Sequence, residues 1–307
     1  MNISVYHKSI PNSKNREKID LLRYFSDGAK VLKESVTDVH SYSYNPTDVA
    51  VLQGWISDKV TRPHLALRNQ VIEGQLKSGN HVVVVDSNLF LYANTNNPLH
   101  YLRYSFDGVF PTTGNYCDQE NVSNTRWEQV FNNIGISLKS DRTSGGHILI
   151  CLQRNGGWSM SGCSVLEWTA NTILELREYT DRPIRLRPHP GDKAARGYLG
   201  DFETSDLLAG VTLSEVGSSL VDDLQDCWAA IGHNSSPTVG AAIEGIPIFL
   251  TDPERSQSRE VANTDLSLIE TPTFYDRVPW VARLAMSHWN FEELKNGMCW
   301  AHMRKFI

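Results

Sequence analysis

The chain has 307 residues, of which 40% are hydrophobic and 21% charged, and its formal net charge is −6. That length suits two domains of ordinary size, each with a core of its own. The composition is that of a globular protein rather than a disordered or fibrous one. The acidic balance argues against a general affinity for nucleic acid, because a surface that tracks phosphates usually needs a basic excess.

The five cysteines form no CxxC pair, and Cys151 and Cys227 lie in apolar runs typical of buried strands. Free thiols in a reducing compartment fit this pattern. The residues from Met1 to Lys33 contain no apolar core of secretory length, and no stretch approaches the roughly 18 apolar residues that cross a bilayer. We therefore expect a cytoplasmic protein with no membrane partner.

The first half of the chain alternates strand and helix patterns, although irregularly. Four short apolar runs bounded by turn residues predict strands at Ile3–Tyr6, Val49–Gln53, His81–Asp86 and Tyr101–Phe110, with a helical pattern, Leu65–Lys77, after the second run. Such alternation favours a parallel sheet covered on both faces. A polar stretch rich in Asn, Ser, Thr and Gly follows from Asn115 to Gly146 and predicts a domain boundary.

The second half alternates more regularly, as in a doubly wound parallel sheet. Its predicted strands are His147–Leu152, Ile184–Arg187, Val211–Leu213, Cys227–Ile231 and Ile246–Leu250, and its predicted helices are Ser164–Tyr179, Ser218–Asp226 and Pro237–Glu244. Apolar residues at helical spacing from Trp280 to Ile307 predict amphipathic helices whose apolar stripe belongs to a core. We expect an α/β protein with domains 1–140 and 141–279, and with C-terminal helices 280–307 packing back across them.

A polar turn that could bind a ligand, Arg187-Pro188-His189-Pro190, follows a predicted strand. The prolines fix the chain so that the His189 imidazole projects from the carboxyl end of the strand, the edge where ligands sit in an open parallel sheet. The imidazole can donate a hydrogen bond to a phosphate oxygen, and the Arg187 guanidinium can add charge-assisted pairing. The structural alternative is a loop that the prolines merely shape, in which His189 caps a neighbour.

A second polar turn, His233-Asn234-Ser235-Ser236, leads from a buried strand into a helix that begins with Pro237 and Thr238. Proline suits the first helical position and Ser236 the N-cap. The amides of a helix start and two hydroxyls can bind an anion, although a simple helix cap is the structural alternative. Both turns follow strands of the same predicted sheet, so we expect them to hold one phosphate from adjacent strands.

Together the two turns, followed by Gly245-Ile246-Pro247, resemble the HP and SS motifs of bacterial sialyltransferases, Kdo transferases and related capsule-polysaccharide glycosyltransferases. Those enzymes have the GT-B fold, in which two Rossmann-like domains face each other across a cleft. The resemblance implies a glycosyltransferase with a nucleotide-sugar donor, UDP- or CMP-linked, whose phosphate contacts His189, Ser235 and Ser236. The expected donor-binding set is completed by Arg187, His233, Asn234, Thr238 and Glu244. The resemblance covers Ile184–Asp252 well and the first half of the chain hardly at all.

Two features bear on the ribose and on the acceptor. Many Kdo-transferase-like sequences have a Glu that could reach the donor ribose where this chain has Gly240, and Glu244 either replaces it or is an exposed helix residue. The pattern from Trp280 to Trp300 also resembles transferase-like proteins of bacteriophages. With the seven basic and three acidic residues of Met1–Lys33, it makes hydroxymethylcytosine or another hydroxymethylated pyrimidine in double-stranded phage DNA the first expected acceptor, and a cell-surface polysaccharide the second.

A transfer reaction also needs a base that takes the proton of the acceptor hydroxyl. Sialyltransferases supply it from an acidic motif that has no exact copy here. The open candidates are Asp86, at the end of a buried strand, Asp107, in Phe106-Asp107-Gly108, and Asp27, before Gly28. Trp55 is expected to stack on an acceptor, and Arg62 and His64 to contact it, although core packing and a helix start are the structural alternatives.

Other classes of function are disfavoured. The sequence has no Asp-x-Asp of metal-dependent transferases and no HExxH, so we expect no metal, and it has no Gly-x-Ser-x-Gly elbow of a serine hydrolase. Two alternatives stay open: a non-catalytic module that binds nucleotide or DNA, and a sugar epimerase of similar fold.

Overall fold

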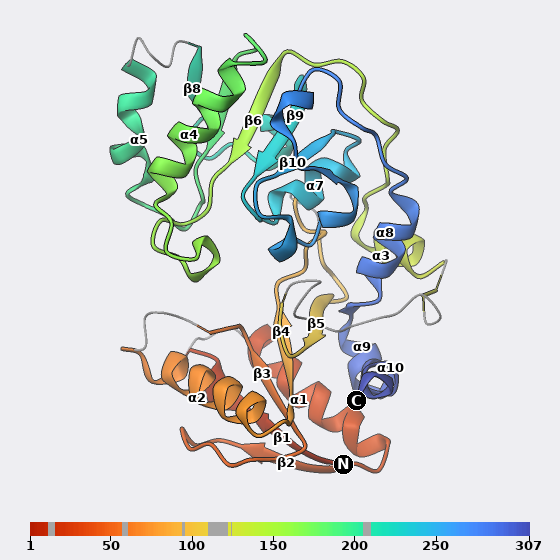
Figure 1. Ribbon diagram of the computed structural model, residues 1–307. Coiled ribbons are helices and arrows are strands. Elements are labelled where there is room, and N and C mark those ends of the chain that lie inside the picture. The colour runs from red at the N-terminus through yellow and green to blue at the C-terminus, as the bar shows by residue number, and fades with distance from the viewer. Residues whose placement is uncertain (12–15, 57–60, 94–95, 110–121, 124, 205–209) are drawn as a thin grey trace. The chain divides into compact units, whose positions relative to one another are not determined.

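The structure is a computed structural model that describes residues 1–11, 16–56, 61–93, 96–109, 122–123, 125–204 and 210–307. The chain divides into two compact units, and each contains a sheet of six described strands (Figure 1). Unit 1 comprises Met1–Asn88, Asn97–Ile134 and Val281–Ile307; unit 2 comprises Leu89–Asn96 and Gly135–Trp280. The first part of the expected polar boundary, residues 115–121, lies outside the described residues.

The sheet of unit 1 is mixed, with the strand order β12-β5-β4-β3-β1-β2. The strands are β1 (Asn2–Tyr6), β2 (Ser35–Val39), β3 (Val49–Gln53), β4 (His81–Asp86), β5 (Leu102–Phe106) and β12 (His288–Trp289). The strands β1 to β4 are parallel, whereas β5 runs antiparallel to β4 and to β12. The unit therefore has one edge at which the carboxyl ends of four parallel strands meet.

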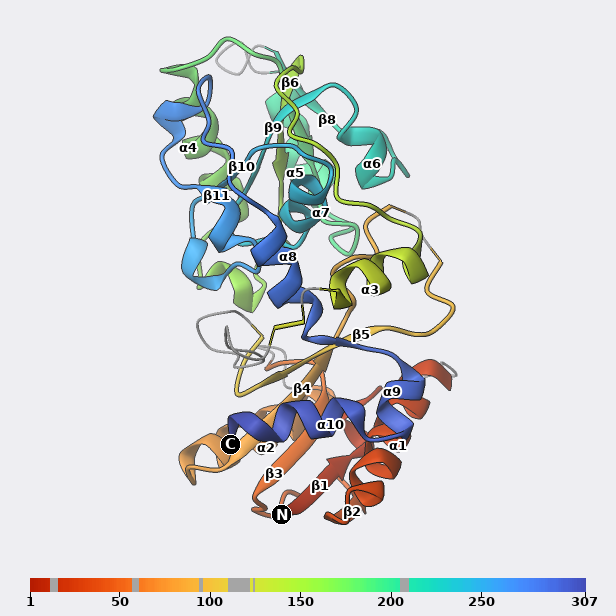
Figure 2. The ribbon, with the colours of Figure 1, turned by 90° about the vertical axis from the view of Figure 1, so that its right-hand side faces the viewer.

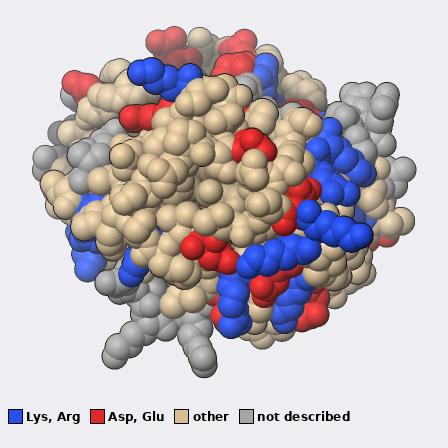
Figure 3. All heavy atoms as spheres, turned by 90° about the horizontal axis from the view of Figure 1, so that it is seen from below, with Lys and Arg blue, Asp and Glu red and all other residues tan. Residues whose placement is uncertain are grey.

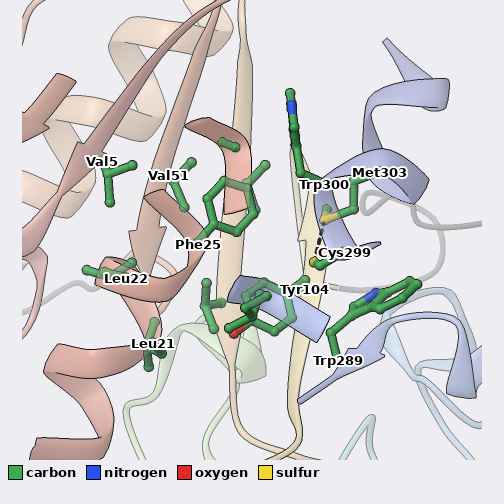
Figure 4. Packing of buried hydrophobic residues seen from close by; sticks show 14 of the residues in the cluster. Val5, Leu21, Leu22, Phe25, Val51, Tyr104, Trp289, Cys299, Trp300 and Met303 are labelled. Carbon is green, nitrogen blue, oxygen red and sulfur yellow. Dashed lines mark hydrogen bonds between the residues drawn. The ribbon is translucent and has the colours of Figure 1, made fainter. Parts of the chain in front are cut away.

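Helices of unit 1 come from both ends of the chain, as the red and blue ribbons show (Figure 2). They are α1 (Arg16–Val31), α2 (Pro63–Lys77), α3 (Arg126–Ile134), α9 (Phe291–Lys295) and α10 (Met298–Met303), while α8 (Val278–Ala285) spans the boundary between the units. In the core, Phe25 of α1 lies edge-on against Trp300 of α10, with ring centroids 5.8 Å apart (Figure 4). The prediction that the apolar stripe of the tail is core is confirmed, since Leu294 and Trp300 are each 1% exposed.

The sheet of unit 2 is parallel throughout, with the strand order β11-β10-β9-β6-β7-β8. Its strands are β6 (His147–Cys151), β7 (Ile184–Arg187), β8 (Val211–Leu213), β9 (Cys227–Gly232), β10 (Ile248–Leu250) and β11 (Ala262–Asn263), and its helices are α4 (Val165–Arg177), α5 (Ala195–Thr204), α6 (Leu220–Asp223) and α7 (Pro237–Ile243). The strand order, with β6 central and strands added on both sides, is that of a doubly wound sheet, so this prediction is confirmed.

A buried histidine makes the stability of unit 1 depend on pH. His288 in β12 is 0% exposed and donates from Nδ1 to the Leu284 carbonyl (2.9 Å), and burial lowers its pKa to about 3. Because the folded pKa lies below the unfolded value, about 6.5, its contribution is complete above pH 6.5 and is lost as the pH falls towards 3. We expect this group alone to remove about 1.4 kcal/mol of unfolding free energy per pH unit in that window.

Urea denaturation at pH 7 and at pH 5, with wild type and His288→Gln compared, measures this contribution. The glutamine amide can still donate to the Leu284 carbonyl but does not titrate, so the variant should lose about 2 kcal/mol less than wild type between the two pH values. Equal losses in the two proteins would show that His288 does not carry the acid sensitivity.

Candidate functional site

The polar turns of unit 2 follow strands that end at the same level of the sheet. Cys151 of β6 pairs with Arg187 of β7 on one side and with Gly232 of β9 on the other. The two turns expected to hold a phosphate therefore flank β6 and do not follow adjacent strands, which corrects that expectation. Two strand spacings, about 10 Å, separate them, so a ligand that touches both turns must also pass the loop after β6.

That middle loop supplies an arginine which the sequence reasoning missed. A Cβ built on Gly191 would lie 2.0 Å from Nη2 of Arg154 and 3.1 Å from Cε1 of His189, so the guanidinium sits against the turn after β7. On its other side the loop reaches the turn after β9, where Gln153 donates to Oδ1 of Asn234 (2.5 Å). A polar Gln-Arg-Asn-Gly-Gly run after a buried strand was the available signal, but the contacts depend on tertiary packing.

His189 is held as a neutral hydrogen-bond donor. Its Nδ1 accepts the backbone N–H of Gly191 (2.9 Å), so in the neutral ring the proton stands on Nε2. Burial lowers the pKa of His189, the nearby Arg154 lowers it further, and Asp192 only partly opposes them. At neutral pH the imidazole can therefore donate from Nε2 to an anionic ligand without carrying a charge of its own.

A pocket of ≈ 410 Å³ opens beside His189, between the turn after β7 and the turn after β8. The neutral His189 lines it, and its charged lining comes from Arg187, Asp192, Lys193, Arg196 and Glu215. Ser214 also lines it, is 3% exposed, and has an Oγ with no hydrogen-bond partner among the described residues. A buried hydroxyl without a partner is costly, and the carboxyl edge of a parallel sheet is where such folds bind ligands.

Arg187 lines this pocket, but its guanidinium is already engaged. Nη1 donates to the carboxylate of Asp223, which is 2% exposed, and to the carbonyls of Ser218 (3.2 Å) and Ser219 (3.1 Å). The side chain thus braces the turn after β8 against β7. Arg154, an exposed residue, is instead the cation that lies beside His189.

Most side chains of the second turn are used inside the fold. The Asn234 amide donates to the carbonyl of Ser159 (3.0 Å) and to Asp252 (2.8 Å), and the Ser235 hydroxyl donates to the Cys151 carbonyl (3.3 Å). Thr238 is 0% exposed and donates to the Ser235 carbonyl (2.7 Å).

Ser236 is exposed and stands at the N-cap position of α7 as expected, but its side chain forms no capping hydrogen bond. Its hydroxyl therefore stays open to a ligand. Of this turn, only Ser236 and the half-buried His233 offer side chains at the surface.

His233 belongs to a separate polar group on the same edge. Its Nδ1 lies 2.8 Å from the Thr251 hydroxyl, and its ring lies 5.7 Å from the ring of Trp168. Burial lowers the pKa of His233, although the carboxylate of Asp252 opposes that shift. An aromatic ring beside a neutral imidazole can pack against a sugar ring at this place.

Glu244 does not reach the carboxyl edge of the sheet. It follows α7, which starts at that edge and returns the chain to the opposite one before β10. There its carboxylate accepts the Tyr92 hydroxyl (2.8 Å), and the Tyr92 ring fills the space beside Gly240, where a Cβ would lie 2.6 Å from the ring. The ring occupies the place of a larger side chain at 240, which explains glycine there. A ribose role for Glu244 is not compatible with this placement.

Two of the aspartates expected as bases lie at opposite edges of the sheet of unit 1. Asp86 ends β4 at the carboxyl edge of the parallel strands, where it accepts Nη2 of Arg103 (2.8 Å). Asp107 follows the antiparallel β5 and lies beside the start of β4, where it accepts the backbone N–H of Val82 (2.7 Å) and contacts His81 Nδ1 (2.7 Å). Asp107 therefore closes a turn at the amino edge.

The carboxyl edge of unit 1 also carries a histidine and carboxylate pair that the sequence reasoning did not single out. Nε2 of His7, after β1, lies 2.8 Å from Oδ1 of Asp38 in β2, and Asp38 also accepts Lys30 (2.8 Å) and Ser26 (3.0 Å). Burial lowers the pKa of His7. With Nε2 donating to the carboxylate, Nδ1 is left as a proton acceptor.

The three residues expected to contact the acceptor follow β3 at this edge. Trp55 is half-buried, Arg62 is exposed, and His64 is half-buried in the first turn of α2, which begins with Pro63. The structural alternative for Arg62 and His64, a helix start, is thus correct, and it leaves both side chains accessible.

Metal-binding clusters and membrane-spanning helices are both absent from the described residues. These residues contain no group of three or more His, Cys, Asp or Glu side chains that could hold a metal ion. Within the same residues, no helix combines the length and the apolar character needed to span a bilayer.

Comparison with known proteins identifies the fold. No family model and no curated protein sequence matches the chain. Among solved structures, the KpsC β-Kdo 2,4-transferase of Thermosulfurimonas dismutans is 14% identical over 88% of this chain and 89% of that chain, with a TM-score of 0.50. The KpsC β-Kdo 2,7-transferase of the same organism is 12% identical over 97% and 98%, also with a TM-score of 0.50. The chain therefore has a GT-B-like fold of two Rossmann-like domains, as expected.

Proposed function

We propose that the chain is a glycosyltransferase that moves a sugar from a nucleotide-sugar donor to a hydroxyl of a saccharide acceptor. The observation that carries the proposal is the pocket at the carboxyl edge of unit 2, which is lined by the neutral imidazole of His189 and by the buried Ser214 hydroxyl, while Arg154 contacts the same turn at Gly191. Two solved structures with the same fold are Kdo transferases, which act on sugars. Both facts support a donor with a nucleoside and a phosphate.

The nucleoside of the donor fits the pocket, and its phosphate fits the mouth beside His189 and Arg154. Glu215 lines the pocket and is exposed, so we assign to it the ribose contact that was expected of Glu244. A carboxylate can accept hydrogen bonds from two ribose hydroxyls, and Ser214 can pair with a polar atom of the base. Ser236 can donate to the phosphate from the turn after β9.

In the reaction, the acceptor oxygen bonds to the anomeric carbon of the donor sugar as the bond from that carbon to the phosphate oxygen breaks. The nucleotide leaves with the electron pair, so negative charge grows on the phosphate. Donors aimed there in advance, Nε2 of His189 and the Arg154 guanidinium, stabilise this charge more in the transition state than in the ground state. This assistance needs no metal ion.

The acceptor proton has to reach a base, and we propose Asp86, whose carboxylate ends β4 at the carboxyl edge of unit 1. The His7 and Asp38 pair at the same edge is the second candidate. Asp107 is not proposed, because its carboxylate is bound to the backbone at the amino edge. Transfer rates of Asp86→Asn and His7→Gln, measured with saturating donor, decide between the two.

For the acceptor we propose a saccharide rather than a hydroxymethylated pyrimidine in DNA. The fold neighbours are Kdo transferases. On the face in Figure 3, Lys and Arg lie interspersed with Asp and Glu along one side, and most of the face is uncharged. A duplex usually binds a continuous basic surface, so nothing on that face favours the DNA acceptor.

Thermal-shift measurements with UDP, CMP, CDP and GDP test the donor site. A nucleotide that binds only the native state raises the melting temperature, by an amount equivalent to about 2.7 kcal/mol at 100 times its Kd. We expect one nucleotide to stand out, and Glu215→Gln to weaken its effect without lowering the melting temperature of the free protein. If none of the four shifts the wild-type protein, the donor site as proposed is wrong.

A turnover assay then separates an enzyme from a non-catalytic binding module. Labelled sugar from the nucleotide sugar that binds is followed into water and into an oligosaccharide acceptor. Binding without any hydrolysis or transfer would favour the module.

A further inference from the structure

The order of strands in unit 1 marks a place for a second ligand. From β1 the chain passes to β2 on one side, and then crosses to β3 and β4 on the other side of β1. The loops after β1 and β3 therefore lead to opposite sides of the sheet at its carboxyl edge. Ligands of open α/β sheets bind at such a switch point. The loop after β1 is the 3₁₀ turn His7–Ser9, and the loop after β3 begins with Gly54.

One arginine spans the switch point. Arg68 of α2 donates from Nε to the carbonyl of Ser9 (2.8 Å) and from Nη2 to Oε1 of Gln53 (2.9 Å). Its Nη1 lies against Gly54, where a Cβ would come within 2.5 Å of it. Gly54 has φ +85°, a conformation that favours glycine. The guanidinium is thus fixed by bonds that use two of its five N–H donors toward the described residues.

The residues that the structure describes give Arg68 no carboxylate partner. Among the residues that the structure describes, neither Arg68 nor Arg62 nor His64 forms an ion pair within 4.0 Å. Burial lowers the pKa of Arg68 to about 10, with Asp86 opposing the shift from a distance, and Asp86 is itself paired with Arg103. Burial and the two arginines also lower the pKa of His64. A half-buried cation without a counter-ion is costly.

We propose that this switch-point site, Arg62, His64 and Arg68, binds an oxyanion on the acceptor, either a carboxylate or a phosphate. The bidentate edge of a guanidinium suits both groups. A purely structural brace would explain the bonds to Ser9 and Gln53, but not two further basic side chains at the N-terminus of α2. Trp55, half-buried in the loop after β3, can pack against the sugar that carries the anion. That the bound anion belongs to the acceptor rests on the proposed transferase function. The binding of an anion at this site does not depend on that function.

Direct binding to the full-length protein tests the site without any nucleotide. The ¹⁵N side-chain signal of the Arg68 Nε–H group, assigned with Arg68→Lys, is followed during titration with methyl β-D-glucuronide, glucose 6-phosphate and methyl β-D-glucoside. We expect the carboxylate sugar, the phosphate sugar or both to shift this signal, and the neutral glucoside to leave it unchanged. The sugar that shifts it identifies the source of the oxyanion.

Variants with intact bracing keep the test independent of folding. Arg62→Gln and His64→Gln leave the contacts of Arg68 with Ser9 and Gln53 in place. Each variant should lower the affinity for the anionic sugar about fivefold. Arg23→Gln, which removes an exposed arginine of α1 that pairs with Asp20, is the matched control and should change nothing. No shift with either anionic sugar, an equal shift with the glucoside, or unchanged affinity in both variants would overturn the inference. Failure of nucleotide binding in unit 2 would leave it standing.

Discussion

Replacing His189 with alanine is expected to lower the rate of sugar transfer by about 10²–10³-fold, because it removes a donor aimed at the charge that develops on the leaving phosphate. The Gly191 N–H donates to Nδ1 and fixes the ring, and burial lowers the pKa of His189. At neutral pH the imidazole therefore acts as a neutral donor through Nε2. That interaction strengthens as the phosphate gains charge, so the effect should fall on kcat more than on donor affinity.

The measurement is transfer of labelled sugar at saturating donor, with nucleotide affinity from thermal shift as the second readout. Tyr179→Ala, which removes an exposed aromatic side chain that follows α4 in unit 2, is the control and should keep transfer within about twofold of wild type. Wild-type turnover in His189→Ala would remove the imidazole from the mechanism. A loss of nucleotide affinity with unchanged kcat would instead assign His189 to ground-state binding.

Much of the fold followed from local sequence. Buried strands such as Val82–Val85 and Ile148–Ile150 are continuous apolar runs bounded by polar turns, so the predicted positions of β3, β4 and β7 match the observed ones. The strand β2 was not predicted, because Ser35–Val39 is a half-exposed edge strand with a polar Thr and Asp. Its place in the sheet comes from pairing with β1, a contact between distant residues that periodicity does not record.

The site was less predictable, since local sequence places a side chain on an edge but does not show its partners. The turn around His189 was predicted because two prolines and the end of a strand are local features. Arg187 was assigned to the phosphate, but its partner Asp223 lies in another element and occupies the guanidinium. Arg154 was missed for the same reason, because only the packed sheet brings its loop against Gly191.

Glycine 28 illustrates a constraint that no motif reveals. We expect Gly28→Ala to destabilise unit 1 by about 3 kcal/mol. A Cβ at this position of α1 would lie 1.8 Å from the backbone carbonyl oxygen of Leu294 and 3.0 Å from Cα of Gly297. Both atoms belong to backbone, so neither can move aside as a flexible side chain would. The helix α1 must shift away from α9 and α10 and open the core around Phe25 and Trp300.

Gly197→Ala is the matched control, because Gly197 also lies in a helix, α5, but has nothing within 4 Å of its Cβ position. There alanine should be neutral or stabilise by about 0.5–1 kcal/mol, the difference in helix propensity. Urea denaturation gives the two changes in unfolding free energy, and hydrogen exchange of peptides from α1 and α9 locates the loss in unit 1. If Gly28→Ala stays within about 0.5 kcal/mol of wild type while its amides remain protected, the close approach of α1 to α9 is not what holds the C-terminal helices on unit 1.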